Sequence, residues 1–529
     1  MNQALVRGII LFIGIASAFM IGGAAANFDT VFLLVSMISL GALLFVSILW
    51  KYVLGLSLLI ALLGLSWYPM GISLGSDELS YLLMVTLIFT QIWRNFETRP
   101  RLDEPAERYL GIFVRVGIFW IIYVGIELAW RLLEIRFYGE SGMKNVVKSY
   151  VGILMSTFCM IYFIQRPTTI VALRNPAKLF LMFLLFSLIL GIGLRSYQSS
   201  FGGSVLEEQT GRLVAGPFVV PGILIVEGIY VLRALAPLAA LSGMLFLTTR
   251  LPNGKRLPGT TRLLASLVLV FGLIGAFLSG GRASIALYVI FVLVVLVLRR
   301  AYFSLFVCGL FFVLLTLVVN VSYRSIESFA PPNVLRSISW MVLDGSNSAS
   351  GDINASTRWR QILFEESLKE WDVSWRTRLV GRGYKGFSET DSLDNEQGGY
   401  YEKIDIALQR GATHSLLSDS LLIFGIIGAT LYYGLLFSQI LLGLAILRTP
   451  GSTPITRCFA WIVAIMGLHA IVVGTLGGSF LGMLNALLVL IAVTECWKDH
   501  KLRADSEEVE DESTAIDSDT KSFPIIGAR

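Results

Sequence analysis

The chain has 529 residues, of which 55% are hydrophobic and only 15% are charged, and its formal net charge is +5. Soluble domains carry roughly a quarter of their residues as charged groups, so this composition excludes an ordinary soluble protein. The modest net charge gives no reason to expect nucleic acid as a partner. The charges fall in clusters between long apolar runs, most of which reach the roughly 18 to 20 residues that a helix needs to cross hydrocarbon. Because backbone in lipid must be helical or form a closed barrel, we predict an all-α polytopic integral membrane protein.

We predict about 14 transmembrane helices (roughly 12 to 14) from the apolar runs. The first run follows Arg7 and leads straight into further spans, so we interpret it as a membrane helix and not as a removable signal peptide. In chain order the spans are expected near 8–26, 30–49, 52–70, 79–95, 111–130, 150–165, 178–194, 218–247, 262–279, 282–299, 302–320, 422–447, 457–475 and 478–497.

The basic residues indicate which connections face the cytoplasm. With the N-terminus inside, nearly every short basic cluster falls on one side, as the positive-inside rule requires. These residues are Arg94, Arg99, Arg101, Arg108, Arg166, Arg174, Lys178, Arg250, Lys255, Arg256, Arg262, Arg299, Arg300, Arg448 and Arg457. We therefore place both termini in the cytoplasm, and the segments 131–149, 195–217 and 321–413 outside.

This topology divides the chain into four parts. Residues 1–320 hold transmembrane helices 1 to 11, and residues 321–413 form one large periplasmic loop. Within the loop we expect a helix from Thr357 to Trp371 and a glycine-rich turn at 381–383. Residues 414–497 hold helices 12 to 14, and 498–529 form an acidic cytoplasmic tail that we expect to be disordered.

Ionisable residues inside spans are costly and need partners. Glu127 and Arg131 are spaced to form an ion pair on one helix face. Glu227 and Arg233 lie in the span 218–247, with Arg233 near its middle. Six residues correspond to roughly 240° around a helix, so each needs a partner on another helix or a water-filled groove. Pro221 and Pro237 favour kinks there.

Arg282 follows Ser279-Gly280-Gly281 between two apolar runs, so the connection must be a tight hairpin. On the predicted topology it lies at the outer surface, where it contacts either lipid phosphate or a bound anion. The other outer arginines are Arg212, Arg358, Arg360, Arg376, Arg378, Arg382 and Arg410. Guanidinium groups bind phosphate oxygens through a two-pronged fork. Arg358 and Arg360 differ by roughly 200° around a helix, so at most one can point into a given site.

His414 is the histidine expected at the outer surface. It follows Thr413, a good helix N-cap, and should lie in the first turn of the next helix. The positive end of the helix dipole favours the neutral imidazole, which can accept a proton from a sugar hydroxyl. The alternative is a histidine that hydrogen-bonds in the headgroup zone.

Several motifs in this order resemble one family. They are the hairpin at 279–282, the arginine-aromatic stretch at 358–363, the Gly-Arg-Gly-Tyr turn opening 381–387, and His414 followed by a Gly-x-x-Gly helix at 424–428. A further arginine-glycine element lies at 211–216. Together they resemble the O-antigen ligase and O-antigen polymerase superfamily of bacterial envelope enzymes. The chain departs from that pattern at Ser415 and Gly281, where the family has asparagine and serine.

The resemblance implies a GT-C-like fold and a metal-independent, inverting glycosyltransferase of cell-surface polysaccharide biosynthesis, such as lipopolysaccharide or exopolysaccharide. It would act at the periplasmic face of the bacterial inner membrane on an undecaprenyl-diphosphate-linked oligosaccharide, with a glycan, lipid or protein as acceptor. The implied catalytic residues are His414, Arg282 and Arg358. Those implied for diphosphate binding are Arg212, Arg360 and Arg382, and Glu227 and Arg233 would line a groove.

Other functions remain open at the level of sequence. Asp77-Glu78, Asp391 and Asp394 offer hard oxygen ligands for Mg²⁺ or Mn²⁺, which would make the transfer metal-dependent. Ligase and polymerase differ only in acceptor, which leaves no readable motif. A transporter or flippase of lipid-linked oligosaccharide fits the number of spans, although no two-half repeat is visible. A structural membrane protein would leave Arg282 and His414 unexplained.

Overall fold

The computed structural model describes part of the chain, and every structural statement below refers to that part. The described residues are 53–63, 65–66, 80, 83–88, 102–135, 140–165, 175–201, 225–226, 228–251, 254–329, 334–335, 338, 341–342, 348–384, 404, 407–408, 413, 415–473 and 480–520. The predicted spans 8–26 and 30–49 lie outside these residues.

Helices make up nearly all of the described chain. They are α3 (Val53–Leu63), α5 (Ala106–Ile135), α6 (Glu140–Ile164), α7 (Pro176–Phe201), α9 (Gly228–Thr248), α10 (Gly259–Leu278), α11 (Arg282–Leu298), α12 (Tyr302–Phe329), α14 (Ser348–Trp371), α15 (Trp375–Val380), α17 (Leu416–Arg448), α18 (Pro454–Val473) and α19 (Phe480–Thr520). Two short strands, β1 (Leu65–Ser66) and β2 (Ile225–Val226), pair antiparallel.

Six helices are long and apolar enough to cross a membrane: Ala106–Leu132, Pro176–Gly193, Gly259–Leu278, Tyr302–Tyr323, Leu416–Arg448 and Pro454–Val472. Shorter apolar helices cover Ser149–Ile164, Leu232–Thr248 and Arg282–Leu298. Large apolar side chains cover the outside of α12, where Phe303 and Val321 are about four-fifths exposed at 81% and 79%. Such surface is rare on soluble proteins and suits lipid. The all-α class and the membrane-type helices are confirmed, while the total of 14 spans stays a prediction.

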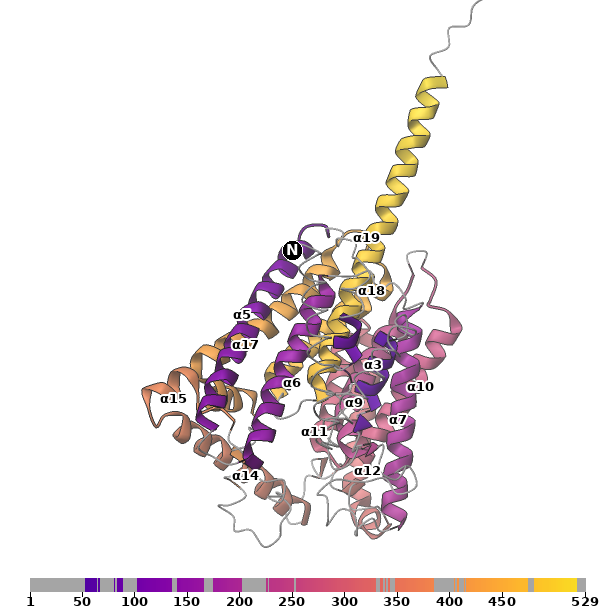
Figure 1. Ribbon diagram of the computed structural model, residues 1–529. Helices are drawn as coiled ribbons and strands as arrows, with labels where there is room; N and C mark the ends of the chain where they lie inside the picture. Colours follow the sequence, from indigo (N-terminus) through magenta and orange to yellow (C-terminus); the bar gives the residue numbers. More distant parts are fainter. Residues whose placement is uncertain are drawn as a thin grey trace, which may run out of the picture.

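The helices alternate in direction, so their connections gather at two opposite ends of the bundle (Figure 1). At one end, the tail end, Arg299 donates to Thr249 at 2.5 Å, and Arg503 pairs with Asp103. At the other end, the loop end, α14 and α15 lie beside α17. The described basic connections belong to the tail end, away from the large loop. This grouping matches the predicted charge pattern, and the side of the membrane that each end faces stays a prediction.

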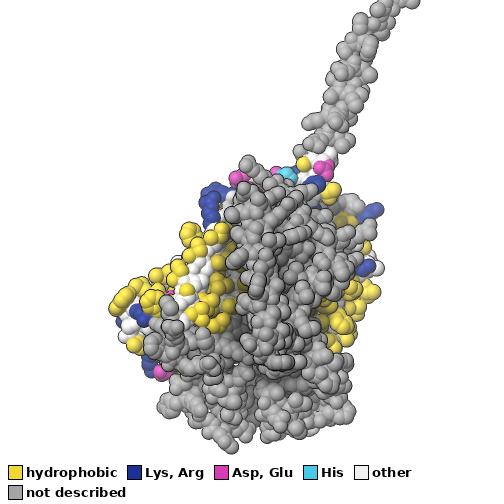
Figure 2. Space-filling view, viewed as in Figure 1, with side chains coloured by type: hydrophobic (Ala, Val, Ile, Leu, Met, Phe, Trp, Pro, Cys, Tyr) yellow, Lys and Arg dark blue, Asp and Glu magenta, His cyan; other side chains and the backbone are white. Residues whose placement is uncertain are grey.

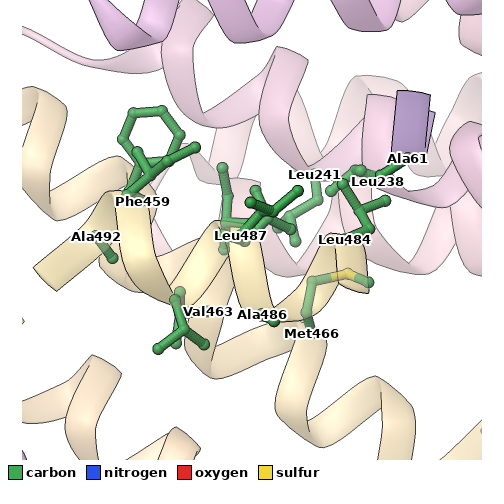
Figure 3. Packing of buried hydrophobic residues seen from close by; sticks show 14 of the residues in the cluster. Ala61, Leu238, Leu241, Phe459, Val463, Met466, Leu484, Ala486, Leu487 and Ala492 are labelled. Atoms are coloured by element: carbon green, nitrogen blue, oxygen red, sulfur yellow. The ribbon is translucent and has the colours of Figure 1, made fainter. Parts of the chain in front are cut away.

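The core joins helices that are far apart in sequence. Leu238 and Leu241 of α9, Phe459 of α18 and Leu487 of α19 belong to one buried cluster (Figure 3). In the same bundle Gln439 of α17 and Asn485 of α19 exchange two amide hydrogen bonds at 2.8 and 2.9 Å. Polar side chains paired in this way tie helices together inside an apolar environment.

Two predicted spans are shorter than expected. The helix in 52–70 ends at Leu63, which gives α3 only 11 residues, or about 16 Å. The helix in 218–247 begins at Gly228, after β2. The cause is the β1–β2 pairing, in which Leu65 lies opposite Val226. Both segments are extended there, and the backbone amides and carbonyls of each strand bond to those of the other. As a correction, Arg233 therefore lies near the start of its helix and not in the middle of a span.

The beginning of the tail is also ordered differently from the prediction. α19 continues to Thr520, so 498–520 is helical where we expected disorder. Contacts at the tail end explain its start: Asp499 accepts from the Thr453 amide and the Thr456 hydroxyl, both at 2.6 Å. His500 lies 3.1 Å from Asp103. Beyond these contacts the helix leaves the bundle (Figure 1).

Candidate functional site

The predicted hairpin joins α10 to α11 at the loop end. α10 ends at Leu278, and α11 begins at Arg282. Gly280 has φ +65°, a conformation that favours glycine, and the Gly281 amide donates to Ser279 Oγ at 3.2 Å. The hairpin interpretation of the paired glycines is confirmed.

Arg233 of α9 packs against this hairpin. Its Nε donates to the Ser279 carbonyl at 3.1 Å, and Ser284 Oγ donates back to the Arg233 carbonyl at 3.2 Å. A Cβ added to Gly281 would lie 3.3 Å from Arg233 Cγ. The expected partner of Arg233 on another helix is therefore the end of α10. We call Arg233, Ser279, Gly280, Gly281, Arg282 and Ser284 the hairpin cluster. It brings two of the predicted site arginines, Arg233 and Arg282, to one place.

The predicted loop helix is present as α14, which extends further toward its N-terminus than expected. Trp359 is the inward residue of the arginine-aromatic stretch and packs on a small core of Leu363, Ile404, Ala407, Leu408 and Leu422. Arg358 and Arg360 flank it, and both are exposed. Their roles at an anion site stay predictions.

The glycine-rich turn after α15 lies along a break in α17. Gly425 has φ +63° and ψ −170°, which interrupts the helix. The interruption frees carbonyl groups, and the loop backbone satisfies them: the Arg382 amide donates to Leu422 at 2.8 Å, and the Gly383 amide donates to Ile423 at 3.0 Å. We call residues 381–384 together with 422–425 the loop–kink junction. The predicted turn is thus hydrogen-bonded to the backbone of α17 at the break in that helix.

Side chains of α5 and α6 close the loop–kink junction from the other side. Tyr123 donates its hydroxyl to the Phe424 carbonyl at 2.6 Å, and Arg131 Nη2 donates to the Gly381 carbonyl at 3.3 Å. The predicted pair of Glu127 and Arg131 is confirmed at 3.6 Å. Sequence reasoning found that pair but missed its contact with the loop. No local signal marks Tyr123, whose partner lies 301 positions further along the chain.

Tyr384 completes the junction. Its amide donates to the Tyr150 hydroxyl at 3.4 Å, and the two rings meet edge to face at 5.1 Å. Burial raises the pKa of the Tyr384 phenol well above its usual value, because the phenolate would lose its hydration. The aromatic residue after the Gly-x-Gly turn was part of the motif, and the structure gives it a packing role.

Arg382 points away from the α17 backbone toward α14. Its side chain is largely buried and forms an ion pair with Glu370. This pair fastens α14 to the junction, and removal of Glu370 would be costly because it takes a carboxylate away from the buried Arg382 guanidinium. The predicted contact of Arg382 with a diphosphate is not tested by this arrangement and stays a prediction.

The start of α17 differs from the predicted cap. Ser415, not Thr413, is the N-cap, and its side chain accepts from the Ser418 amide at 3.5 Å. Thr413 instead donates both its amide (2.9 Å) and its hydroxyl (2.6 Å) to the carboxylate of Asp419, which is fully buried. An N-cap side chain would accept from a helix amide, whereas Thr413 donates to Asp419, whose ionised carboxylate is a strong acceptor. Asp419 was not singled out in the sequence.

We expect Asp419→Ala to destabilise the loop end of α17 by roughly 2 kcal/mol, because it leaves the buried Thr413 amide without its acceptor and removes the carboxylate that accepts from the Thr413 hydroxyl. Thermal unfolding of the purified protein measures the effect. Asp372→Ala is the matched control, since that carboxylate is 57% exposed in a pair with Arg378 and exposed pairs contribute little. Equal melting temperatures for the two variants would contradict the role given to Asp419.

Three predicted site residues, His414, Arg212 and Glu227, lie outside the described residues, as do Asp77, Glu78, Asp391 and Asp394. The hairpin cluster and the loop–kink junction both lie at the loop end, since α11 and α17 begin there.

No protein-family model matches the chain, and no curated protein matches it. The fold and the site together define an all-α protein with membrane-type helices, which carries an arginine-bearing hairpin and a folded loop at one end of its bundle.

Proposed function

We propose that the chain is a glycosyltransferase of the O-antigen ligase and polymerase type. It would move a glycan from an undecaprenyl-diphosphate donor to an acceptor sugar, lipid or protein at the periplasmic face of the bacterial inner membrane. One observation carries the proposal. Two motif elements, the arginine hairpin and the Gly-Arg-Gly turn, lie at the same end of an apolar helical bundle.

The proposed chemistry is a displacement at the anomeric carbon of the donor sugar. The acceptor oxygen forms the new glycosidic bond as the bond to the diphosphate breaks, with inversion. Negative charge grows on the leaving diphosphate, and fixed guanidinium groups aimed at it would stabilise the transition state without a metal. Arg282 is the main candidate, with Arg233 beside it and Arg358 or Arg360 supplied by α14. His414 would take the acceptor proton or hold the diphosphate.

A flippase or transporter of lipid-linked oligosaccharide is the second candidate. Its support in the sequence was the number of spans, together with the ionisable residues Glu227 and Arg233 within one span. Arg233 lies near the start of α9 and contacts the hairpin backbone, so the support from ionisable residues is reduced to Glu227, which lies outside the described residues.

The test is reconstitution in proteoliposomes with an undecaprenyl-diphosphate oligosaccharide. Longer glycans on the same lipid would indicate a polymerase, and glycan on a different lipid or protein would indicate a ligase. Movement of the donor between leaflets with no new bond would overturn the proposal in favour of the flippase. We expect the first or second result, and we expect it to persist in Arg108→Ala, which removes an exposed arginine at the tail end.

A further inference from the structure

α15 and the turn that precedes it expose large apolar side chains in the middle of the charged loop. Val373 and Trp375 are each 76% exposed, and Leu379 is 41% exposed. The segment is well fixed despite its short length. Ser374 Oγ accepts from the Thr377 amide at 3.1 Å, and the Thr377 hydroxyl accepts from the Ser374 amide at 3.0 Å, which is a capping box. The exposure is therefore a feature of a defined local fold.

This apolar surface continues a stripe on α5. Ile122, Ile126 and Trp130 follow one another at intervals of four residues, so they share one helix face, and each is more than half exposed. Arg376 of α15 lies over the Trp130 ring, 5.2 Å from its centroid. Hydrophobic side chains gather on this side of the molecule and reach α15 (Figure 2). Because α5 is long and apolar enough to cross a membrane, its exposed stripe fits lipid, and α15 lies at the end of that stripe.

The polar residues of α15 suit the boundary between lipid and water. Arg376 and Arg378 are exposed, and Arg378 pairs with Asp372 at the rim. Tryptophan and arginine are enriched where an apolar body meets the headgroup layer, because one part of each side chain is apolar and the other is polar. A second copy of the chain would not explain why the apolar surface is continuous with a membrane-type helix.

We propose that α15 is an interfacial membrane anchor, with Val373, Trp375 and Leu379 inserted among the phospholipid chains just below the headgroups of the membrane that α5 crosses. The anchor has a consequence for the site. Residues 381–384 follow α15 directly and are bonded to the break in α17, so insertion of α15 would hold the loop–kink junction at headgroup depth. The proposal rests on the membrane-type fold and does not require glycosyl transfer.

The test places an environment-sensitive label on the loop of the full chain. Val373→Cys is made in a Cys308→Ala background, since the other native cysteines are buried, and is labelled with a nitrobenzoxadiazole dye. The protein is placed in nanodiscs at one copy per disc. We expect lipids carrying a spin label near the headgroup to quench the dye at least twofold more strongly than aqueous iodide does. Lys369→Cys on α14, whose side chain is 69% exposed, is the matched control and should show the reverse order.

Stronger quenching of position 373 by iodide than by lipid would overturn the anchor. Protection from iodide that appears only in discs holding two copies would assign the surface to self-association and would also overturn it. Leu379→Cys provides a second position in case the first variant fails to fold. The quenching measurement does not depend on glycan transfer. The membrane anchor and the proposed glycosyltransferase function can therefore be disproved independently of each other.

Discussion

Arg282→Ala is expected to lower glycan transfer by roughly 10²–10³-fold, the usual effect of removing one preorganised group that stabilises transition-state charge. The arginine begins α11 directly after a hairpin in which Gly280 has positive φ, and the Ser279 carbonyl is held by Arg233. The guanidinium is therefore carried on a fixed backbone. Arg282→Lys should recover little activity, since lysine restores the charge but not the two-pronged fork that matches phosphate oxygens.

The measurement is the initial rate of glycan transfer in proteoliposomes, normalised to inserted protein. Arg108→Ala, the tail-end control, should retain the full rate. A melting temperature of Arg282→Ala within about 1 °C of the parent would separate loss of chemistry from loss of fold, since a change of about 1 kcal/mol shifts a chain of this length by roughly that amount. Full activity in Arg282→Ala would remove this residue from the site.

The features that could be predicted are those set by short-range geometry. Two apolar runs separated only by Ser279-Gly280-Gly281 leave no arrangement except a hairpin. Glu127 and Arg131 are four residues apart, and a helix places them together wherever it lies. The apolar runs located the membrane-type helices for the same reason, because length and composition are properties of each run alone.

The features that could not be predicted depend on partners distant in sequence. Tyr123 contacts Phe424 across 301 positions and Arg131 contacts Gly381 across 250, and neither contact leaves a local pattern. The cap at Thr413 was wrong because α17 begins at Leu416, so that Ser415 is the cap and Thr413 bonds to the buried Asp419 instead. The helix predicted across 225–226 was wrong because hydropathy cannot separate a helix from a short apolar strand that pairs with another segment.

A substitution at the break in α17 is expected to have the second large effect, on the stability of the loop. Gly425→Ala is expected to destabilise the loop–kink junction by roughly 3 kcal/mol or more. The backbone at φ +63° and ψ −170° lies in a region that is essentially restricted to glycine. A Cβ there would also lie 2.4 Å from the Gly381 amide nitrogen and from the Leu379 carbonyl oxygen. Both neighbours are backbone atoms, so no side-chain rotation can relieve the contact.

The expected result is selective: α15 and residues 381–384 detach from α17, while the bundle stays inserted. Faster trypsin cleavage at Arg378 and Arg382 would report the detachment, and under the proposed function transfer would fall with it. Gly434→Ala in the same helix is the matched control, because its Cβ would meet only Val116 Cγ1 at an ordinary 3.6 Å and alanine favours a helix interior. Equal cleavage rates in the two variants would mean that the glycine break does not hold the loop. The docking of the loop on α17 would then need a different physical cause, since the bonds from Arg382 and Gly383 to the opened turn depend on the same backbone geometry.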